Sequence, residues 1–394
     1  MSKYVKNQDS NATWTIDESD ETWTLKKDAT ITVFGDTIEV LESSTGNHLN
    51  VFGDLDANGA LARGINVAGD DTTITIGKAS RIDAWTGIRN EADGLRVMNH
   101  GDIVGNVQGI LSTTAAVIRG DGDISGERGI ETYGGSVVKN LAGGEIIGNS
   151  IGILIEDGYD SRVINHGLIS GADAAVTITS LGDNLFRNTG TVSGDLYFGS
   201  GRDTIDVRKG FVDGVINGGD GNDTYKVSSH DTEISEILGF GTDRVYSTSS
   251  FSLEDNIENL FLIGKADGSG WGNDDDNVVM GNKGDNSLAG GAGDDFLGGG
   301  KGDDVMNGDE GEDMFVFKRG DGHDRITGFE DGVDQIYLPE FKKFDSFDDL
   351  EGRISQHGAD VWISLGQGDR LVIMNTDISI IDENDFTFQL TSVA

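Results

Sequence analysis

Apolar residues recur along the first half of the chain at intervals that suit one coil of a solenoid. Six short β-branched segments open on Ile82, Ile103, Ile124, Ile146, Ile169 and Val192, with steps of 21, 21, 22, 23 and 23 residues. Short strands joined by glycine turns at a nearly fixed period are typical of a right-handed parallel β-helix, whose coils stack on one another. We therefore predict such a β-helix over residues 61–197.

A polar position accompanies these apolar ones. Asn99, Asn165 and Asn188 each lie four residues before the next apolar ladder position, and Asn140 lies six residues before Ile146. Buried polar side chains need hydrogen-bond partners, which identical side chains on neighbouring coils supply. The sequence predicts a buried asparagine ladder at one corner, interrupted at Gly120.

A second pattern with a twenty-residue period follows. Turns of the form G-x-G-x-D end at Asp203, Asp223 and Asp243, and the middle one contains Gly219 and Gly221. Twenty residues suit one solenoid coil. We predict coils of this length over residues 198–271, in which the three aspartates stack as one cation-binding column.

Five consecutive nonapeptides fill residues 272–316 without a shift of phase: GNDDDNVVM, GNKGDNSLA, GGAGDDFLG, GGKGDDVMN and GDEGEDMFV. The eighth position is always apolar, and the sixth is always aspartate or asparagine. The sixth-position residues are Asn277, Asn286, Asp295, Asp304 and Asp313, and the turn glycines of the last three copies are Gly290, Gly293, Gly299, Gly302, Gly308 and Gly311.

The acidic residues of these repeats require a counterion. Carboxylates on stacked strands ~4.8 Å apart repel each other by roughly 3 kcal/mol at an effective dielectric near 20. Asp and Glu outnumber Lys and Arg by 69 to 29, the net charge is −40, and there is no cysteine. Oxygen ligands without thiolates suit hard cations, above all calcium, and the negative charge argues against nucleic-acid binding.

The five nonapeptides match G-G-x-G-x-D-x-U-x and resemble the RTX (repeats-in-toxin, haemolysin-type) family. That resemblance implies a calcium-binding parallel β-roll in which Asp295, Asp304 and Asp313 are side-chain ligands, whereas Asn277 and Asn286 depart from the family's aspartate. The segment from Gly218 to Gly264 resembles the linker module of haemolysin-type RTX proteins.

Residues 317–394 resemble the β-rich module that closes the β-roll in serralysin-type proteases. Gly320 to Asp324 repeat the G-x-G-x-D turn, which makes Asp324 another candidate ligand. The tail from Asp385 to Phe388, followed by QLTSVA, resembles an uncleaved type I secretion signal. The resemblance implies several calcium ions, export through a type I secretion apparatus, and an extracellular or cell-surface location, as in a Gram-negative bacterium.

We thus expect an all-β protein with an N-terminal β cap over residues 1–60, a β-helix, the twenty-residue coils, the β-roll and a C-terminal cap. The N-terminus has no apolar signal-peptide core, and no run reaches about 18 apolar residues, so a membrane span is not expected.

Two functional classes stay open at this stage. The six histidines form no H-E-x-x-H motif, and Gly148–Gly152 match G-x-S-x-G only within the coil ladder. We favour a non-catalytic structural, adhesive or surface-layer role, with cell surfaces, acidic polysaccharide or further copies of the chain as partners. The alternative is a polysaccharide lyase or epimerase that uses an outward acidic column of Asp102, Asp123 and Glu145.

Overall fold

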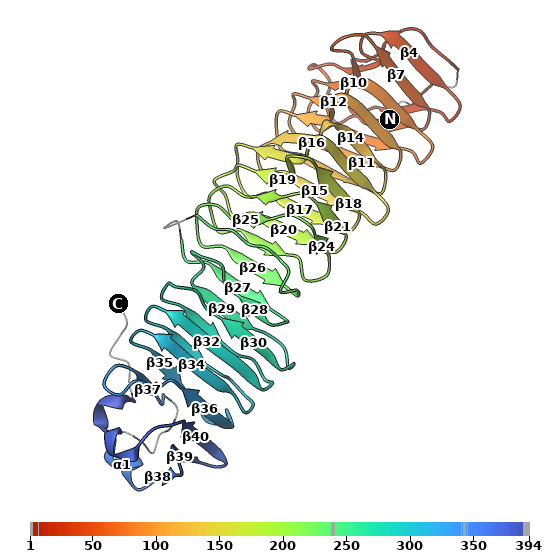
Figure 1. Cartoon of the computed structure of the whole chain (residues 1–394). Coiled ribbons are helices and arrows are strands. Elements are labelled where there is room, and N and C mark those ends of the chain that lie inside the picture. Colours follow the sequence, from red (N-terminus) through yellow and green to blue (C-terminus); the bar gives the residue numbers. More distant parts are fainter. Residues whose placement is uncertain are drawn as a thin grey trace. The chain divides into compact units, whose positions relative to one another are not determined.

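The computed structural model describes residues 3–6, 8–237, 241–339, 341, 344 and 346–388. The chain divides into an N-terminal unit, Met1–Gly221, and a C-terminal unit, Asn222–Ala394. Each unit is built almost entirely of short parallel strands that stack coil upon coil (Figure 1). The predicted all-β parallel solenoid is thereby confirmed.

Strands of the N-terminal unit form two parallel ladders. The first ladder contains β1 (Lys3–Lys6), β3 (Thr22–Leu25), β6 (His48–Val51), β9 (Thr73–Ile76), β11 (Leu95–Asn99), β13 (Ala116–Gly120), β15 (Val137–Asn140), β17 (Arg162–Asn165), β20 (Leu185–Asn188) and β23 (Thr204–Asp206).

The second ladder of this unit includes the longest strands. It contains β2 (Trp14–Ile16), β4 (Thr30–Phe34), β5 (Ile38–Val40), β7 (Asp54–Asn58), β8 (Arg63–Val67), β10 (Arg81–Asn90), β12 (Asp102–Ser112), β14 (Ile124–Tyr133), β16 (Glu145–Glu156), β18 (Leu168–Gly171), β19 (Ala174–Ile178), β21 (Thr191–Ser193), β22 (Leu196–Tyr197), β24 (Phe211–Val212) and β25 (Ile216–Asn217).

The core of the N-terminal unit is the predicted aliphatic ladder. Ile82 pairs with Ile103, and the register continues one coil at a time to Val192. All six ladder residues are at most 3% exposed. Because side chains alternate in direction along a strand, this register places the apolar ladder residue of each coil inside and its neighbours along the strand outside.

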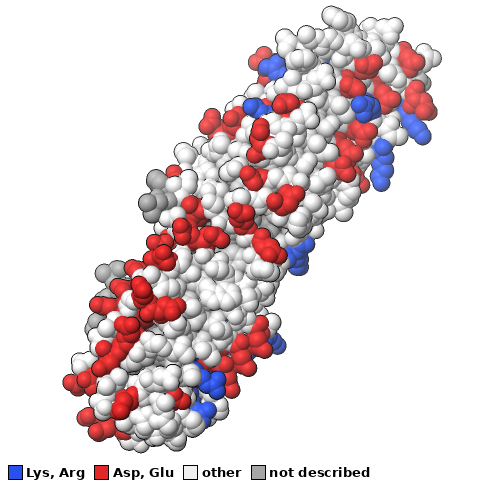
Figure 2. Space-filling model, in the orientation of Figure 1, with Lys and Arg blue, Asp and Glu red and all other residues white. Residues whose placement is uncertain are grey.

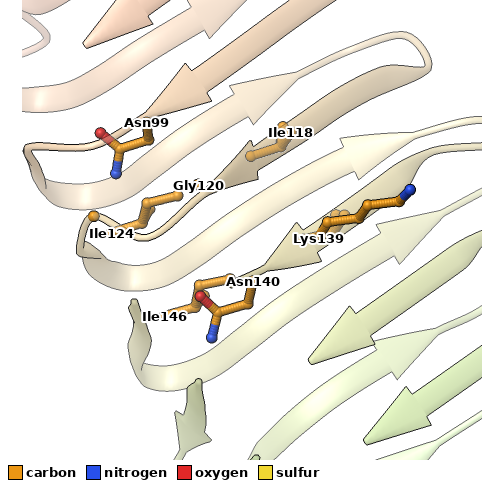
Figure 3. Close-up of a pocket in the computed structure, with 9 residues that line it drawn as sticks. Asn99, Ile118, Gly120, Ile124, Lys139, Asn140 and Ile146 are labelled. Atoms are coloured by element: carbon orange, nitrogen blue, oxygen red, sulfur yellow. The ribbon is translucent and has the colours of Figure 1, made fainter. Parts of the chain in front are cut away.

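The asparagine ladder lies at a corner of the same coils. Asn140 Nδ2 donates to Asn165 Oδ1 at 2.9 Å, and Asn165 Nδ2 donates to Asn188 Oδ1 at 2.9 Å. Gly120 occupies the ladder position between Asn99 and Asn140 (Figure 3). A cavity of about 10 Å³ is lined by Asn99, Gly120 and Asn140, and this is about the room that one water molecule needs.

Residues 14–60 also form parallel coils. Trp23 pairs with Leu49, and Leu49 pairs with Ile74. These coils are longer than the 21–23-residue coils that follow, which explains why the sequence shows no clear period there. The role of residues 1–60 as a cap stays a prediction.

The C-terminal unit likewise has two ladders. One contains β26 (Thr224–Val227), β27 (Arg244–Ser247), β29 (Asn259–Leu262), β31 (Val278–Met280), β33 (Phe296–Gly298), β35 (Met314–Val316), β37 (Gln335–Tyr337) and β41 (Phe386–Thr387). The other contains β28 (Phe251–Ser252), β30 (Gly268–Trp271), β32 (Asn286–Ala292), β34 (Val305–Glu310), β36 (His323–Thr327), β40 (Asp369–Ile373), β39 (Asp360–Gly366) and β38 (Ile354–His357).

Successive nonapeptides enter opposite ladders, so two repeats make one coil. Val279, Leu297 and Phe315 stack in one ladder, and Leu288 stacks on Met306 in the other. These eighth-position side chains are at most 2% exposed and fill the narrow interior between the two sheets. As a result, each acidic turn stacks on the turn two repeats away.

The chain ends in a different arrangement. Strands β38, β39 and β40 pair antiparallel, and β40 pairs parallel with β36. One short helix, α1 (Asp348–Glu351), and two 3₁₀ turns, η1 (Ile378–Ile380) and η2 (Glu383–Asp385), complete the described part. Residues 389–394, which end the expected secretion signal, lie outside the described residues. Among the described residues no helix is long and apolar enough to span a membrane.

Candidate metal centre

The sixth-position residues of the nonapeptides, together with Asp324 and Asp334, form two corner stacks. One stack contains Asn277, Asp295, Asp313 and Asp334, and the other contains Asn286, Asp304 and Asp324; all seven are at most 3% exposed. Asp334 was missed by the sequence analysis because it follows no G-x-G-x-D turn. Only the strand register, which pairs β35 with β37, identifies it.

Each carboxylate in these stacks uses one oxygen to hold the preceding coil. Asp295 Oδ1 accepts from the backbone N–H of Asn277 at 2.8 Å, and Asp304 Oδ1 accepts from that of Asn286 at 2.7 Å. Asp324 Oδ1 accepts from the N–H of Asp304 at 3.0 Å. The hydrogen bond fixes the carboxylate in the turn, so only its second oxygen is available for another partner.

That second oxygen is buried without a partner in two of the turns. Oδ2 of Asp295 and Oδ2 of Asp304 make no hydrogen bond with any described residue and are inaccessible to solvent. Leaving a buried charged oxygen unsatisfied costs more than the net gain of an ordinary hydrogen bond. A cation beside these oxygens would remove that cost.

The first glycine of each repeat makes space for the second oxygen. A Cβ atom on Gly290 would overlap Asp295 Oδ2, and one on Gly299 would overlap Asp304 Oδ2. The fourth-position glycines have another reason: Gly293 has φ of 98° and Gly302 has φ of 128°. L-residues with side chains rarely adopt these angles, so the turns expose their carbonyls only with glycine there.

Burial also shifts the pKa values of the stacked aspartates. Burial raises the pKa of Asp295 to about 7, with the nearby carboxylate of Asp313 adding to the effect. Burial raises the pKa of Asp304 and Asp313 to about 6 and that of Asp324 to about 8. In each case the backbone hydrogen bond lowers the pKa, but the loss of water outweighs it.

These residues fit calcium. Asp295, Asp304, Asp313 and Asp324 offer carboxylate oxygens, and the glycine turns offer backbone carbonyls, which together are the ligand types that calcium prefers. Bound calcium would supply the positive charge that the buried oxygens lack.

A family model described as the RTX calcium-binding nonapeptide repeat (4 copies) matches residues 271–306, 284–315 and 291–323. Residues 271–323 are RTX calcium-binding repeats.

Two curated proteins of Rhizobium meliloti (strain 1021) resemble this chain. Endo-1,3-1,4-beta-glycanase EglC is 40% identical over 198 residues, which are 50% of this chain and 40% of the relative. Endo-1,3-1,4-beta-glycanase ExsH is 34% identical over 179 residues, which are 45% of this chain and 36% of the relative. The chain therefore spans well under two thirds of either relative.

Among solved structures, the crystal structure of extracellular lipase LipA from Serratia marcescens is similar with a TM-score of 0.23 and 14% sequence identity. The similarity covers 58% of this chain and 45% of the lipase.

A further acidic group lies before the RTX repeats. One oxygen each of Asp223, Glu236 and Asp243 lies within 4.8 Å of the others. Asp243 Oδ1 accepts from the N–H of Asp223 at 2.7 Å, and the Tyr225 hydroxyl donates to Glu236. Burial raises the pKa of Asp243 to about 6. The sequence predicted Asp223 and Asp243 together but missed Glu236, which no repeat pattern marks.

Asp203, Gly219 and Gly221 belong to the N-terminal unit. Asp203 is 1% exposed, and its Oδ1 accepts from the backbone N–H of Asn184 at 2.6 Å. Burial raises the pKa of Asp203 to about 6. Gly219 and Gly221 adopt φ of 90° and 130° and lie against the turn of the preceding coil. The predicted stacking of Asp203 on Asp223 joins the two units and stays a prediction.

Uncharged side chains make the same corner contact in the coils of the N-terminal unit between Ala116 and Asn184. Ser136 Oγ accepts from the N–H of Ala116 at 3.0 Å, Ser161 Oγ accepts from that of Ser136 at 3.2 Å, and Asn184 Oδ1 accepts from that of Ser161 at 3.0 Å. The coil-to-coil hydrogen bond therefore needs no carboxylate, so the charges in the RTX stacks must serve another interaction.

The structure also shows where the two candidate enzymatic features lie, the G-x-S-x-G match around Ser150 and the outward acidic column. Ser150 lies within strand β16 and donates to Asp173, with no strand-to-helix elbow around it. Asp123 Oδ1 accepts from the N–H of Glu145 at 3.0 Å, and Arg81 lies 4.0 Å from Asp102. Within the outward acidic column, Asp123 thus holds the next coil through a hydrogen bond, and Asp102 is ion-paired with the preceding coil.

Proposed function

We propose that this protein is secreted, that its RTX repeats fold when calcium binds outside the cell, and that it then serves a structural or adhesive role. The single observation that carries the proposal is the pair of buried second oxygens of Asp295 and Asp304, which have no hydrogen-bond partner among the described residues.

The contrast between the coils from Ala116 to Asn184 and the RTX stacks supports this proposal. Serine and asparagine suffice at the corner of those coils, whereas the RTX stacks use buried aspartates whose pKa is raised by burial. Neutral residues would stack at lower cost in the absence of metal. Retaining carboxylates is advantageous only where a divalent ion completes the turn.

The expected affinities suit a switch between two compartments. Extracellular calcium modules bind with dissociation constants of ~10⁻⁴ to 10⁻³ M, so the sites would be empty in cytosol and filled outside the cell. A site at about ten times its dissociation constant adds only ~1.4 kcal/mol. Several coupled sites would be needed to convert an expanded, exportable chain into a folded one.

A calcium titration of the full chain tests the proposal. Starting in chelator, strand content measured by circular dichroism should rise cooperatively with calcium, and the hydrodynamic radius should fall. Magnesium at the same concentration should have less effect, because it demands smaller octahedral sites. A strand signal already complete in chelator contradicts the proposal.

The second candidate function is a polysaccharide-acting enzyme. It is favoured by the 40% identity to a protein named endo-1,3-1,4-beta-glycanase, although the chain covers only 40% of that relative. Release of reducing ends from a mixed-linkage β-glucan, or increased ultraviolet absorbance on alginate or pectate, would support it. An inactive protein that responds to calcium would leave the structural role.

A further inference from the structure

One outward sheet face of the N-terminal unit gathers cations on an otherwise acidic molecule. Strands β11, β13, β15, β17 and β20 follow one another in the first ladder and contain no Asp or Glu. Each contributes one cation to the outer face, and these are Arg96, Arg119, Lys139, Arg162 and Arg187. Acidic residues dominate the visible surface elsewhere (Figure 2), so we name these five the basic face.

The register places the basic face in two adjacent rows. Arg119 pairs with Lys139, and both share a row with Arg187. Arg96 and Arg162 occupy the row two residues earlier. Stacked strands are ~4.8 Å apart, so five successive coils present one cation each at that interval along the stacking direction.

Most of these cations have no partner within the described part of the chain. The side chains of Arg96, Arg119 and Arg162 are exposed and make no hydrogen bond or ion pair with any described residue. Lys139 is half-buried, and its amino group points away from the side chain of Asn140 (Figure 3). Only Arg187 has an ion pair, 3.7 Å from Asp206.

Apolar side chains fill the positions between the cations. Met98 is 43% exposed and Val117 is 36% exposed. Ile164 lies between Lys139 and Arg187 in the same row. A ligand on this face therefore meets alternating positive and apolar surface, which suits a chain that carries both carboxylates and apolar ring faces.

The rims of the face are acidic and limit the width of a ligand. Asp121 lies at the corner after β13, paired with His100 and 3.9 Å from Lys78. Asp160 and Asp183 lie before β17 and β20, and Asp160 Oδ1 accepts from the N–H of Asp183. Asp183 is also ion-paired with Arg202 at 2.8 Å, so Asp160 is the rim carboxylate that disfavours a wider anionic ligand such as a DNA duplex or a broad anionic membrane.

We propose that the basic face binds a single linear polysaccharide with one carboxylate per sugar residue, laid along the stacking direction. The cations lie in two adjacent rows that run along the stacking direction, so carboxylates on either side of an extended polysaccharide chain can meet them. This gives the adhesive role proposed above a specific ligand and rests on that role, but it does not depend on calcium, because the corner of these coils is stacked by uncharged side chains.

The test compares the full-length protein with a triple variant, Arg119→Gln, Lys139→Gln and Arg162→Gln. A matched control, Lys27→Gln, Lys209→Gln and Lys265→Gln, removes the same charge at exposed positions outside the face. Binding to polygalacturonate is measured in chelator at low salt and again with added salt, with methyl-esterified pectin as the uncharged probe of the same backbone.

We expect polygalacturonate binding that weakens steeply with salt, weakens roughly tenfold in the triple variant and stays unchanged in the control. Equal binding by the triple variant, equal binding of the esterified pectin, or tighter binding of duplex DNA or anionic vesicles overturns the proposal. Circular dichroism with calcium should be the same for all three proteins. A wild type that binds polygalacturonate but ignores calcium would sink the proposed calcium-coupled folding and leave the basic face intact.

Discussion

Oδ1 of Asp313 accepts a hydrogen bond from the backbone N–H of Asp295 at 3.0 Å. The two residues are 18 positions apart in sequence and belong to alternate nonapeptides, yet they are direct neighbours in the stack. Burial raises the pKa of Asp295, and the carboxylate of Asp313 adds to that effect while holding the backbone of Asp295. Hydrogen bonds stabilise a stack of this kind, whereas repulsion between its carboxylates destabilises it.

Asp304→Asn should separate these two effects. Asparagine keeps an oxygen for the N–H of Asn286 but removes the charge from the buried second position. We expect the calcium midpoint of folding to rise roughly tenfold and the metal-free repeats to become more stable. Circular dichroism during calcium titration and thermal melts in chelator measure both.

The matched control is Asp303→Asn at the exposed neighbouring position, whose Oδ1 accepts from the N–H of His323 at 3.0 Å. It removes the same charge and should shift the calcium midpoint far less. Equal shifts in the two variants would mean that overall charge, not the buried oxygen, sets the affinity.

Gly299→Ala tests the space that Asp304 Oδ2 occupies. The new Cβ would overlap that oxygen and Cγ of Asp304. Overpacking of this kind costs about 1–3 kcal/mol, and the displaced carboxylate should also bind calcium less tightly. Gly352→Ala is the control, because nothing lies within 4 Å of its added methyl group and its φ is not left-handed. Similar melting temperatures for both variants with calcium would contradict the assigned role of Gly299.

In the absence of metal, mild acid should stabilise the repeats. Burial raises the pKa of Asp295 to about 7 and that of Asp324 to about 8, against about 3.9 in an unfolded chain. The folded state therefore binds more protons between these values, so the stabilisation is complete below about pH 4 and lost as pH rises through about 6 to 8.

Metal-free protein should accordingly show more strand at pH 5 than at pH 8, while calcium affinity should increase with pH because the ligands must be deprotonated. The double variant Asp295→Asn and Asp324→Asn should lose most of this pH dependence. If metal-free protein is instead more ordered at pH 8, the carboxylates are not buried as described.

The sequence predicted those parts of the molecule that depend on a constant period. Ile82, Ile103 and Ile124 reveal their register because equal steps bring them to the same face. Glu236 and the basic face were not predicted, because their residues do not recur at a constant interval in the sequence. Arg96 and Arg119 belong to neighbouring strands but lie in different rows of the face, and only the strand register shows that they share it. Asp334 was missed because it lies outside the nonapeptides and joins the stack only because β37, which follows it, pairs with β35.

Asn165→Leu should destabilise the N-terminal unit independently of calcium. Asn165 is fully buried, donates to Asn188 Oδ1 and to the Thr191 carbonyl at 2.9 Å, and accepts from the side chain of Asn140. Leucine has a similar size but leaves those groups unsatisfied, at a cost of about 1–3 kcal/mol for each. Asn149→Leu, at an exposed position of β16, is the control. Because uncharged side chains stack the corner of these coils, the loss should appear equally in calcium and in chelator; a loss that calcium reverses would show that the N-terminal coils also depend on the metal.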